Sequence, residues 1–248
     1  MKKSKIKVSV IVATYNCVNS IEKTIKSFIA QNYSEKELII IDGGSTDETQ
    51  NIIKKYKNNI SFWVSEPDKG ISDAFNKGIK HSTGDFIYFL GAGDYFWKNN
   101  VLKLMMTDVD PENNSIVCGR INRISQNNNK IIYASEIDFQ KWHLLYKMSL
   151  PHQGLFMNIK YFNKYGLFDT NLVYAMDYEI LLRAYGEFPT VVMKDIVVAA
   201  WIEGGVGTNK IDKVLDEYKI IKIKNHVAPT IIVNIIDMII RIRYSLFK

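Results

Sequence analysis

The chain has 248 residues with 32 Lys+Arg against 26 Asp+Glu, which gives a formal charge of +6. This length suits one α/β domain with a short appendage, and 47% hydrophobic with 23% charged residues excludes a disordered chain. Two cysteines and no Cys/His cluster exclude a disulfide framework and a zinc motif, so a reducing compartment is expected.

The positive charge is concentrated at the two ends of the chain. Residues 1–7 hold four lysines and residues 219–248 hold a net +5, which leaves −3 for residues 8–218. Nucleic-acid binders usually carry their positive charge on the binding body, so this acidic body argues against nucleic acid as a partner. The basic ends instead favour contact with an anionic membrane surface.

No segment is apolar over the ~18 residues that a transmembrane helix needs. The lysines before the apolar run at 8–13 imitate a signal peptide. That run is short for the apolar part of a signal peptide and is followed by no plausible cleavage site, so a buried first strand is the preferred interpretation.

The first hundred residues alternate between strand and helix patterns. The β-branched, continuously apolar run at 6–13 indicates a central parallel strand covered on both faces. Short connections and βαβ alternation predict a doubly wound, mostly parallel α/β sheet that binds ligands at the carboxyl ends of its strands. Further strands are expected at 37–41, 61–64 and 86–90, and helices at about 21–29, 47–56 and 73–81.

The pattern is looser after residue 100, and no linker rich in Pro, Gly or Ser marks a second domain. We therefore expect one domain over 1–226, with a nucleotide-binding half at 1–100 and an acceptor half at 101–226, followed by an amphipathic helix at 227–248. Turns are predicted at 113–114 and 126–129, strands at 116–124 and 130–134, and helical segments near 139–147, 158–165 and 177–185.

Acidic side chains follow several of the predicted strands. Asp42 follows the second strand, Asp68 and Asp73 flank the turn after the third, and Asp94 follows the fourth. Because parallel strands end at one edge of the sheet, these carboxylates should converge, where they could bind ribose hydroxyls or a divalent cation. Each one taken alone is equally a turn former or helix cap.

Three segments together resemble the family 2 inverting glycosyltransferases, which have the GT-A fold. These segments are 8–16 (VSVIVATYN), 42–47 (DGGSTD) and 65–79 (SEPDKGISDAFNKGI), the last being most similar to the O-antigen branch. The resemblance extends over about residues 6–205, and the motifs occur in the family's order and spacing.

The resemblance implies that the strand ends bind the nucleotide of a UDP-sugar. Gly43 stands where many members have a base-contacting Asp. The implied nucleotide-sugar residues are Ala13, Thr14, Asp42, Ser45, Asp68, Asp73 and Gly93.

The family's metal motif is a pair of acids after the fourth strand. Here Gly93 occupies the first acidic position and only Asp94 remains. The resemblance implies that Asp94 binds Mg²⁺ or Mn²⁺, with diphosphate oxygens and water as the other ligands.

The segment MDYEILLR at 176–183 resembles the family segment that supplies the catalytic base. Asp177 matches the base, which must accept the proton of the acceptor hydroxyl. Without the resemblance, Asp177 would be a first-turn helix residue that favours the macrodipole. Glu179, two residues on, is the weaker candidate for the base because it would leave another side of the helix. The resemblance also implies a sugar pocket around His152, Gln153 and Glu179. A structural histidine is the alternative for His152.

A glycine-containing loop at 201–209 matches a flexible family loop, and Gly204 and Gly205 are expected to offer backbone N–H groups to the diphosphate. A plain loop is an equal alternative. After Pro229, a helix with one narrow polar stripe is predicted to the end of the chain. It suits the membrane interface, where lysine and arginine meet anionic head groups. Packing on the protein's own core or in a homodimer is the alternative.

The predicted function is transfer of a hexose or N-acetylhexosamine from a UDP-sugar to a polyprenyl-diphosphate-linked saccharide in O-antigen or polysaccharide synthesis. The enzyme would act at the inner face of the cytoplasmic membrane and form a β linkage. A catalytically silent nucleotide-sugar-binding or scaffold subunit is the first alternative, and a sugar nucleotidyltransferase is the second. The latter should have a basic, glycine-rich loop after the first strand, which residues 13–17 are not.

Overall fold

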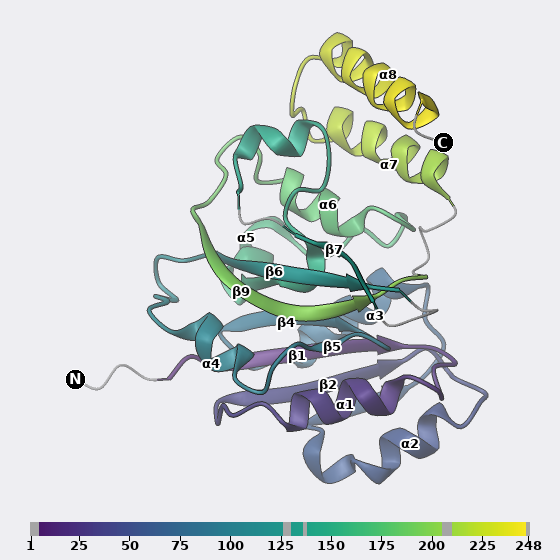
Figure 1. The fold of residues 1–248 in the computed structure, drawn as a ribbon, viewed down its shortest axis with the longest axis vertical. Coiled ribbons are helices and arrows are strands. Elements are labelled where there is room, and N and C mark those ends of the chain that lie inside the picture. The colour runs from purple at the N-terminus through teal and green to yellow at the C-terminus, as the bar shows by residue number, and fades with distance from the viewer. Residues whose placement is uncertain (1–4, 126–129, 136–137, 205–209, 247–248) are drawn as a thin grey trace.

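Four parallel strands form the first half of a computed structural model that describes residues 5–125, 130–135, 138–204 and 210–246 (Figure 1). They are β1 (Val8–Thr14), β2 (Lys36–Asp42), β3 (Phe62–Ser65) and β4 (Phe86–Gly91), adjacent in the order β3-β2-β1-β4. Thr14 pairs with Asp42, and Asp42 pairs with Ser65. The strands therefore end level with one another, and the predicted parallel arrangement is confirmed.

Helices cover both faces of these strands because successive side chains of a strand point to opposite faces. Val10 and Val12 pack in one hydrophobic cluster with α1 (Ile21–Ile29) and α2 (Thr49–Lys55). Ile11 packs in the other cluster with α3 (Ile71–His81). A short helical turn, η1 (Lys57–Asn59), follows α2.

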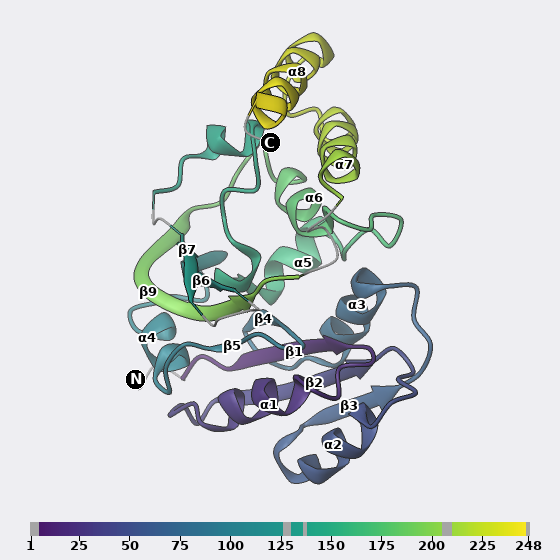
Figure 2. The same cartoon turned by 45° about the vertical axis from the view of Figure 1, so that its right-hand side comes forward.

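The second half extends the same sheet with antiparallel and parallel strands (Figure 2). β8 (Leu155–Asn158) runs antiparallel between β4 and β6 (Ile116–Ile124), and β9 (Val191–Ile202) curls beside β6 in parallel. β7 (Ile131–Ala134) pairs with β6, and β5 (Tyr95–Phe96) pairs with β9. The strands predicted at 116–124 and 130–134 are confirmed, and the turn predicted at 126–129 lies outside the described residues.

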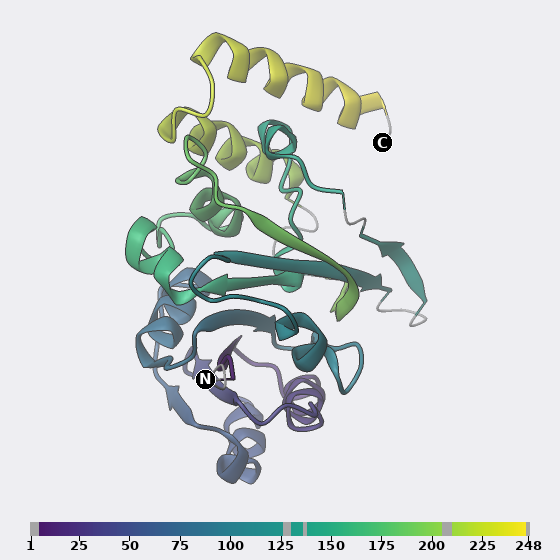
Figure 3. The same cartoon turned by 90° about the vertical axis from the view of Figure 1, so that its left-hand side faces the viewer.

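The later helices stack away from the parallel strands. α7 packs on α6, and α8 packs on α7 at the far end of the molecule (Figures 1 and 3). Val233 of α8 belongs to the same hydrophobic cluster as α6. No helix within the described ranges is long and apolar enough to cross a membrane. The remaining helical elements are α4 (Val101–Met106), η2 (Lys141–Leu145), η3 (His152–Gly154), α5 (Ile159–Tyr165), α6 (Met176–Leu182), α7 (Ile211–Lys224) and α8 (Thr230–Leu246).

Candidate active site

The loops after β1 and β2 are tied together at the carboxyl edge of the sheet. The backbone N–H of Asn16 donates to Ser45 Oγ at 2.8 Å, and Asn16 Oδ1 accepts from the N–H of Thr46 at 2.9 Å. The N–H of Cys17 donates to Thr49 Oγ1 at 2.8 Å. These bonds hold the two predicted nucleotide-binding loops in one fixed arrangement.

Asp42 lies behind these loops and is fully buried. Its Oδ2 accepts hydrogen bonds from the N–H of Ser45 at 2.9 Å and from Ser65 Oγ at 2.5 Å, while Oδ1 accepts from Ser45 Oγ. Both carboxylate oxygens are thus used within the protein. The structure thus shows that Asp42 shapes the turn, and its contact with a nucleotide stays a prediction.

Thr14 has a buried hydroxyl at the end of β1. The residue is 5% exposed, and its Oγ1 has no hydrogen-bond partner among the described residues. An unpaired buried hydroxyl costs free energy of order 1–3 kcal/mol, so this atom favours a partner from outside the chain. Ala13, its neighbour, is half-buried.

Asp68 faces the glycine that follows Asp42. A Cβ atom built on Gly43 would lie 2.7 Å from Asp68 Oδ2, so the Asp68 carboxylate occupies the space that a side chain at position 43 would need. Its Oδ1 accepts from the N–H of Gly70 at 2.9 Å. Asp73, in the first turn of α3, instead accepts from the N–H of Lys69 at 3.2 Å.

The turn after β4 places Asp94 over the end of that strand. Gly93 has a φ of 118°, a conformation that L residues rarely adopt. Its N–H donates to Thr24 Oγ1 at 2.9 Å, and that hydroxyl donates to the carbonyl of Asp94 at 2.8 Å. The turn is therefore pinned to α1, and an acidic residue at position 93 would be strained.

The carboxylate of Asp94 is largely buried. Oδ1 accepts from the N–H of Ile202 at 2.8 Å, and Oδ2 lies 2.7 Å from where a Cβ on Gly91 would be. Burial raises the pKa of Asp94 to about 7, opposed by the bond from Ile202 and by a side-chain hydrogen bond from Gln153.

No three His, Cys, Asp or Glu side chains in the described ranges converge as a metal-binding group. Asp94 could serve as a single protein ligand to a divalent cation through Oδ2, because Oδ1 accepts the hydrogen bond from Ile202. The other ligands of a hard cation would then have to be substrate oxygens and water.

Asp177 lies in the first turn of α6 and faces His152 of η3. The distance from Asp177 Oδ2 to His152 Nδ1 is 4.0 Å, and both side chains are mostly buried. Burial raises the pKa of Asp177, while His152 and the N–H of Tyr178 oppose this rise. Burial lowers the pKa of His152, with Asp177 opposing.

A carboxylate from α7 holds the start of α6. Glu217 Oε1 accepts from the N–H of Val173 at 2.9 Å, and Oε2 accepts from Tyr174 at 2.9 Å and Ala175 at 2.8 Å. These N–H groups precede the helix that carries Asp177. Sequence patterns did not reveal Glu217, because its partners lie 42 to 44 residues earlier in the chain.

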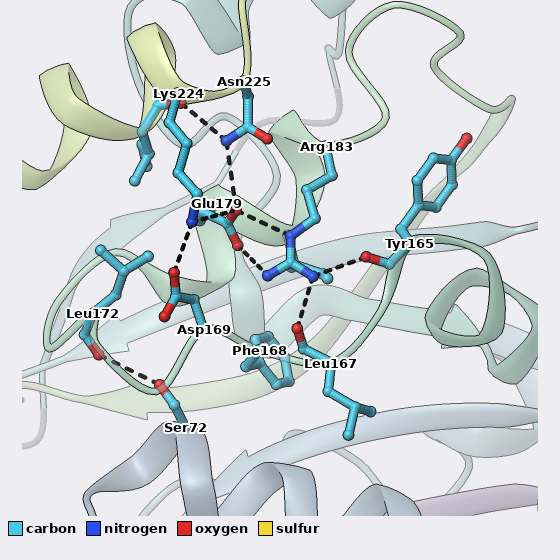
Figure 4. A network of polar contacts seen from close by, with 12 residues as sticks. Ser72, Tyr165, Leu167, Phe168, Asp169, Leu172, Glu179, Arg183, Lys224 and Asn225 are labelled. Atoms are coloured by element: carbon cyan, nitrogen blue, oxygen red, sulfur yellow. Dashed lines mark hydrogen bonds and ion pairs between the residues drawn. The ribbon is translucent and has the colours of Figure 1, made fainter.

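Glu179 belongs to a buried ion-pair network rather than to a sugar pocket (Figure 4). It is 1% exposed, and its oxygens accept from Arg183 Nε at 3.0 Å and Nη2 at 2.6 Å. Arg183 also donates to the carbonyls of Tyr165 and Leu167 at 2.8 and 2.7 Å. The expectation that Glu179 lines the pocket is therefore corrected, because its neighbour Arg183 draws the carboxylate into the interior.

The one-turn segment η3 connects the two acids of the site. His152 faces Asp177, and the side chain of the next residue, Gln153, lies close enough to Asp94 to oppose the rise in its pKa. A Cβ on Gly154 would lie 2.4 Å from the carbonyl oxygen of Gly119, so only glycine lets this turn lie so close to β6. Asp94 and Asp177 are far apart in the sequence, but they lie near the adjacent residues Gln153 and His152, respectively.

The glycine loop after β9 is only partly described. Gly204 has a φ of 105°, while Gly205 lies outside the described residues. The neighbouring Glu203 forms an ion pair with Arg123 Nη2 at 2.8 Å.

A family model described as Glycosyl transferase family 2 matches residues 9–179 of the chain. The chain belongs to this glycosyltransferase family. The match includes β1 to β4, the Asp94 turn, η3 and Asp177.

Two relatives agree with this membership. An uncharacterized glycosyltransferase of Mycobacterium tuberculosis is 31% identical over 71% of this chain and 68% of its own length. A PGL/p-HBAD biosynthesis glycosyltransferase of Mycobacterium bovis is 27% identical over 83% of this chain and 80% of its own length.

Two structures have the same fold. S. aureus TarS 1–349 in complex with UDP-GlcNAc superposes with a TM-score of 0.74 at 20% identity, over 98% of this chain and 74% of that chain. The mannosyltransferase PcManGT from Pyrobaculum calidifontis, in complex with GDP-Man and Mn²⁺, has a TM-score of 0.67 at 17% identity, over 96% and 70%.

Proposed function

We propose that this family 2 enzyme transfers a hexose or N-acetylhexosamine from a UDP-sugar to a lipid-diphosphate-linked saccharide, with inversion to a β linkage. The observation that carries the proposal is the connection of Asp94 and Asp177 through the adjacent residues Gln153 and His152. Binding of UDP-GlcNAc by TarS, which has the same fold, supports a UDP-linked donor.

Asp177 is proposed as the base of a direct displacement. The acceptor oxygen would attack the anomeric carbon, its proton would pass to the Asp177 carboxylate, and the nucleoside diphosphate would leave. The partial burial of Asp177 suits this role, because a raised pKa strengthens the carboxylate as a base. At neutral pH the base must still be ionised, and the neighbouring His152 and the N–H of Tyr178 favour that state.

Asp94 is the proposed ligand of Mg²⁺ or Mn²⁺. The cation would supply counter-charge for the leaving diphosphate. The N–H of Ile202 holds the Asp94 carboxylate in place. Because this chain offers one carboxylate, we expect weak binding of the cation without donor and tighter binding with it.

The remaining donor contacts are assigned to the edges of the loops. Thr14 has an unpartnered hydroxyl, and Asp68 takes the space left by Gly43 beside the β2 loop. We assign Ala13, Ser45, Asp73 and Gly93 to the walls of the same site, and Gly204 with Gly205 to the diphosphate loop.

The proposed acceptor is lipid-borne, and α8 is the proposed contact with the inner face of the cytoplasmic membrane. Residues on one side of α8 pack on α7, while the other side exposes a continuous row of apolar side chains. The exposed apolar residues of α8 are Ile231, Ile232, Ile235, Met238, Ile239, Ile242 and Leu246. An exposed apolar face beside basic residues is typical of interfacial helices, and a lipid-linked O-antigen or polysaccharide precursor would be reached there. Homodimerisation through this face is the alternative.

The Asp177→Asn variant tests the chemical assignment. We expect the rate of transfer from a UDP-sugar in the presence of Mn²⁺ to fall ~10²–10⁴-fold, the usual contribution of general-base catalysis. The affinity for UDP, measured by calorimetry, should be unchanged. The matched control is Asp169→Asn, which removes a carboxylate that pairs with Lys224 near α6. Near-normal transfer by the Asp177 variant would sink the assignment of the base.

The wild-type protein in the same assay separates the rival functions. Binding of UDP-sugar without transfer to any lipid-diphosphate acceptor and without hydrolysis would support a silent binding or scaffold subunit. Formation of a UDP-sugar from UTP and a sugar phosphate would support the nucleotidyltransferase.

The double variant Ile235→Glu/Ile239→Glu tests the membrane contact. Both side chains are about half exposed, at 48% and 51%, so the change should leave the fold intact while it places two charges on the apolar face. We expect loss of sedimentation with vesicles that contain anionic phospholipid. Unchanged vesicle binding would contradict the role of α8, and a shift from dimer to monomer in the same variant would favour the homodimer.

A further inference from the structure

His152 is packed among aromatic rings. Its ring packs against the rings of Phe75 and Phe89, at centroid distances of 5.6 and 5.5 Å. These contacts come from α3 and β4, respectively. The imidazole is therefore fixed by aromatic packing on the elements of the first half, and it has little freedom to follow a mobile substrate.

The polar atoms of His152 face one charged group. Nδ1 lies 4.0 Å from Asp177 Oδ2, and Nε2 is buried with no hydrogen-bond partner among the described residues. The Asp177–His152 distance exceeds a hydrogen bond, but such bonds are often long before substrate binds and shorten in the complex. An imidazole that donates through Nδ1–H would point its proton at the carboxylate.

Other groups also surround Asp177. Burial, and to a smaller extent repulsion by Glu217 from α7, raises the pKa of Asp177. Burial, and after it the charge of Asp177, raises the pKa of Tyr218. The N–H of Tyr178 donates to Asp177 Oδ1 at 2.8 Å. His152 thus opposes the rise in the pKa of Asp177 that burial and Glu217 cause. Its ring packs on α3 and β4, which belong to the first half of the chain.

We propose that His152 is a positioning residue that holds the Asp177 carboxylate in its ionised form and aims it at the acceptor, and that it does not bind the donor sugar. This inference rests on the proposed role of Asp177 as the base. In the transfer step, the bond from the acceptor oxygen to the anomeric carbon forms as the bond to the diphosphate oxygen breaks. The electron pair leaves with the diphosphate, and the hydroxyl proton ends on Asp177. His152 keeps its own proton throughout.

Two substitutions distinguish this role from sugar binding. His152→Phe keeps the aromatic packing but removes the donor, whereas His152→Asn retains an N–H group close to the position of Nδ1. We expect the acidic limb of kcat/KM for the acceptor to move to higher pH by about one unit in His152→Phe. The limb should move less in His152→Asn, and the Kd for UDP-sugar should stay within twofold in both variants.

The control is His226→Asn, which changes an exposed histidine whose φ of 50° asparagine tolerates. This variant should keep the wild-type pH profile. An unshifted acidic limb in His152→Phe would overturn the positioning role, as would a donor Kd raised tenfold in both His152 variants.

A measurement on histidine itself keeps the inference testable if His152→Phe folds poorly. Titration of ¹³C-labelled histidine by NMR should show that Asp177→Asn lowers the pKa of His152, because removal of a negative neighbour disfavours imidazolium. An unchanged pKa would overturn the coupling. If this pKa falls but Asp177→Asn retains normal transfer, the coupling stands and the proposed base is wrong, so the two failures are distinguishable.

Discussion

Two buried carboxylates, Asp42 in the first half of the chain and Glu179 in the second, are held in different ways. In the first half, Asp42 is satisfied by N–H and hydroxyl donors from Ser45, three residues away, and from Ser65 on the neighbouring strand. In the second half, Glu179 is held by a charged partner, Arg183, and Glu217 reaches a loop 42 to 44 residues earlier. Asp42 is thus held by uncharged donors, whereas Glu179 is held by a cation.

This difference teaches that an acid's place in the sequence does not decide its function. Asp177 and Glu179 are two residues apart on α6, so their side chains leave different sides of the helix. Asp177 faces His152, while Glu179 is buried beside Arg183. The direction of each side chain, set by what packs on each side of α6, separates a candidate base from a structural ion pair.

The largest effect should come from breaking the ion pair of the second half. Glu179→Gln leaves the guanidinium of Arg183 buried without its carboxylate, and we expect the free energy of unfolding to fall by about 3–5 kcal/mol. Urea denaturation measures this loss. The matched control is Glu112→Gln, because Glu112 pairs with Lys160 on the surface and such pairs contribute about 0–1 kcal/mol. Equal losses of unfolding free energy in Glu179→Gln and Glu112→Gln would show that the buried ion pair stabilises the fold no more than the surface pair does.

A smaller effect is expected from the corresponding change in the first half. Asp42→Asn replaces one accepting oxygen by an NH₂ group that faces the donors of Ser45 and Ser65. The free energy of unfolding should fall by about 1–3 kcal/mol, and UDP affinity should weaken as the loop loses its shape. Calorimetry and urea denaturation measure the two quantities, and unchanged stability would show that Asp42 does not hold the turn.

Asp169 should make the stability of the second half depend on pH. The ammonium group of Lys224 and the N–H of Asn171 lower its pKa to about 2, below the ~3.9 of an unfolded chain. A lowered pKa stabilises the fold above the unfolded value, and that contribution is lost as the pH falls through the folded value. Wild type should therefore exceed Asp169→Asn by about 1–2 kcal/mol at pH 7.

This difference should shrink between about pH 5 and pH 2. Unfolding free energies at pH 7, 5 and 3 measure it. A difference that stays constant down to pH 3 would show that ionisation of Asp169 does not contribute.

The smallest effect is expected on the outer face of α8. Ile239→Glu changes a half-exposed side chain and should alter the free energy of unfolding by less than about 0.5 kcal/mol. Val233→Ala, on the buried side of the same helix, should cost about 1–3 kcal/mol. Thermal unfolding compares them, and similar costs would show that the outer face is also packed in solution.

The first half of the fold was predictable because its strands are continuous apolar runs that end in short polar turns. β8, β9 and α7 were not predicted. β8 has only four residues, and β9 contains Lys194 and Asp195 within its span. Lys194 is tolerated there because its ammonium group donates to the carbonyl of Leu104 at 3.1 Å. A long-range contact of this kind leaves no periodic signal in the sequence.

Some residues around the proposed site were found from the sequence and others only from the structure. Asp94 and Asp177 were selected from motifs, and their roles stay predictions. Glu217, which supports the turn before α6, gave no local signal, because its partners lie 42 to 44 residues away. Ser65 belongs to the motif at 65–79, but its bond to Asp42, 23 residues earlier, was not predicted.

The amino-acid sequence by itself determined the family, the four parallel strands and the net charge of −3 between the basic ends. These features depend on local patterns, namely apolar runs, turn residues and short motifs. Only the tertiary structure decided that His152 faces Asp177, that Glu179 pairs with Arg183 and that one side of α8 is exposed. Hydrogen bonds and ion pairs act over a few ångströms in space, so their partners are set by how the helices and strands pack together.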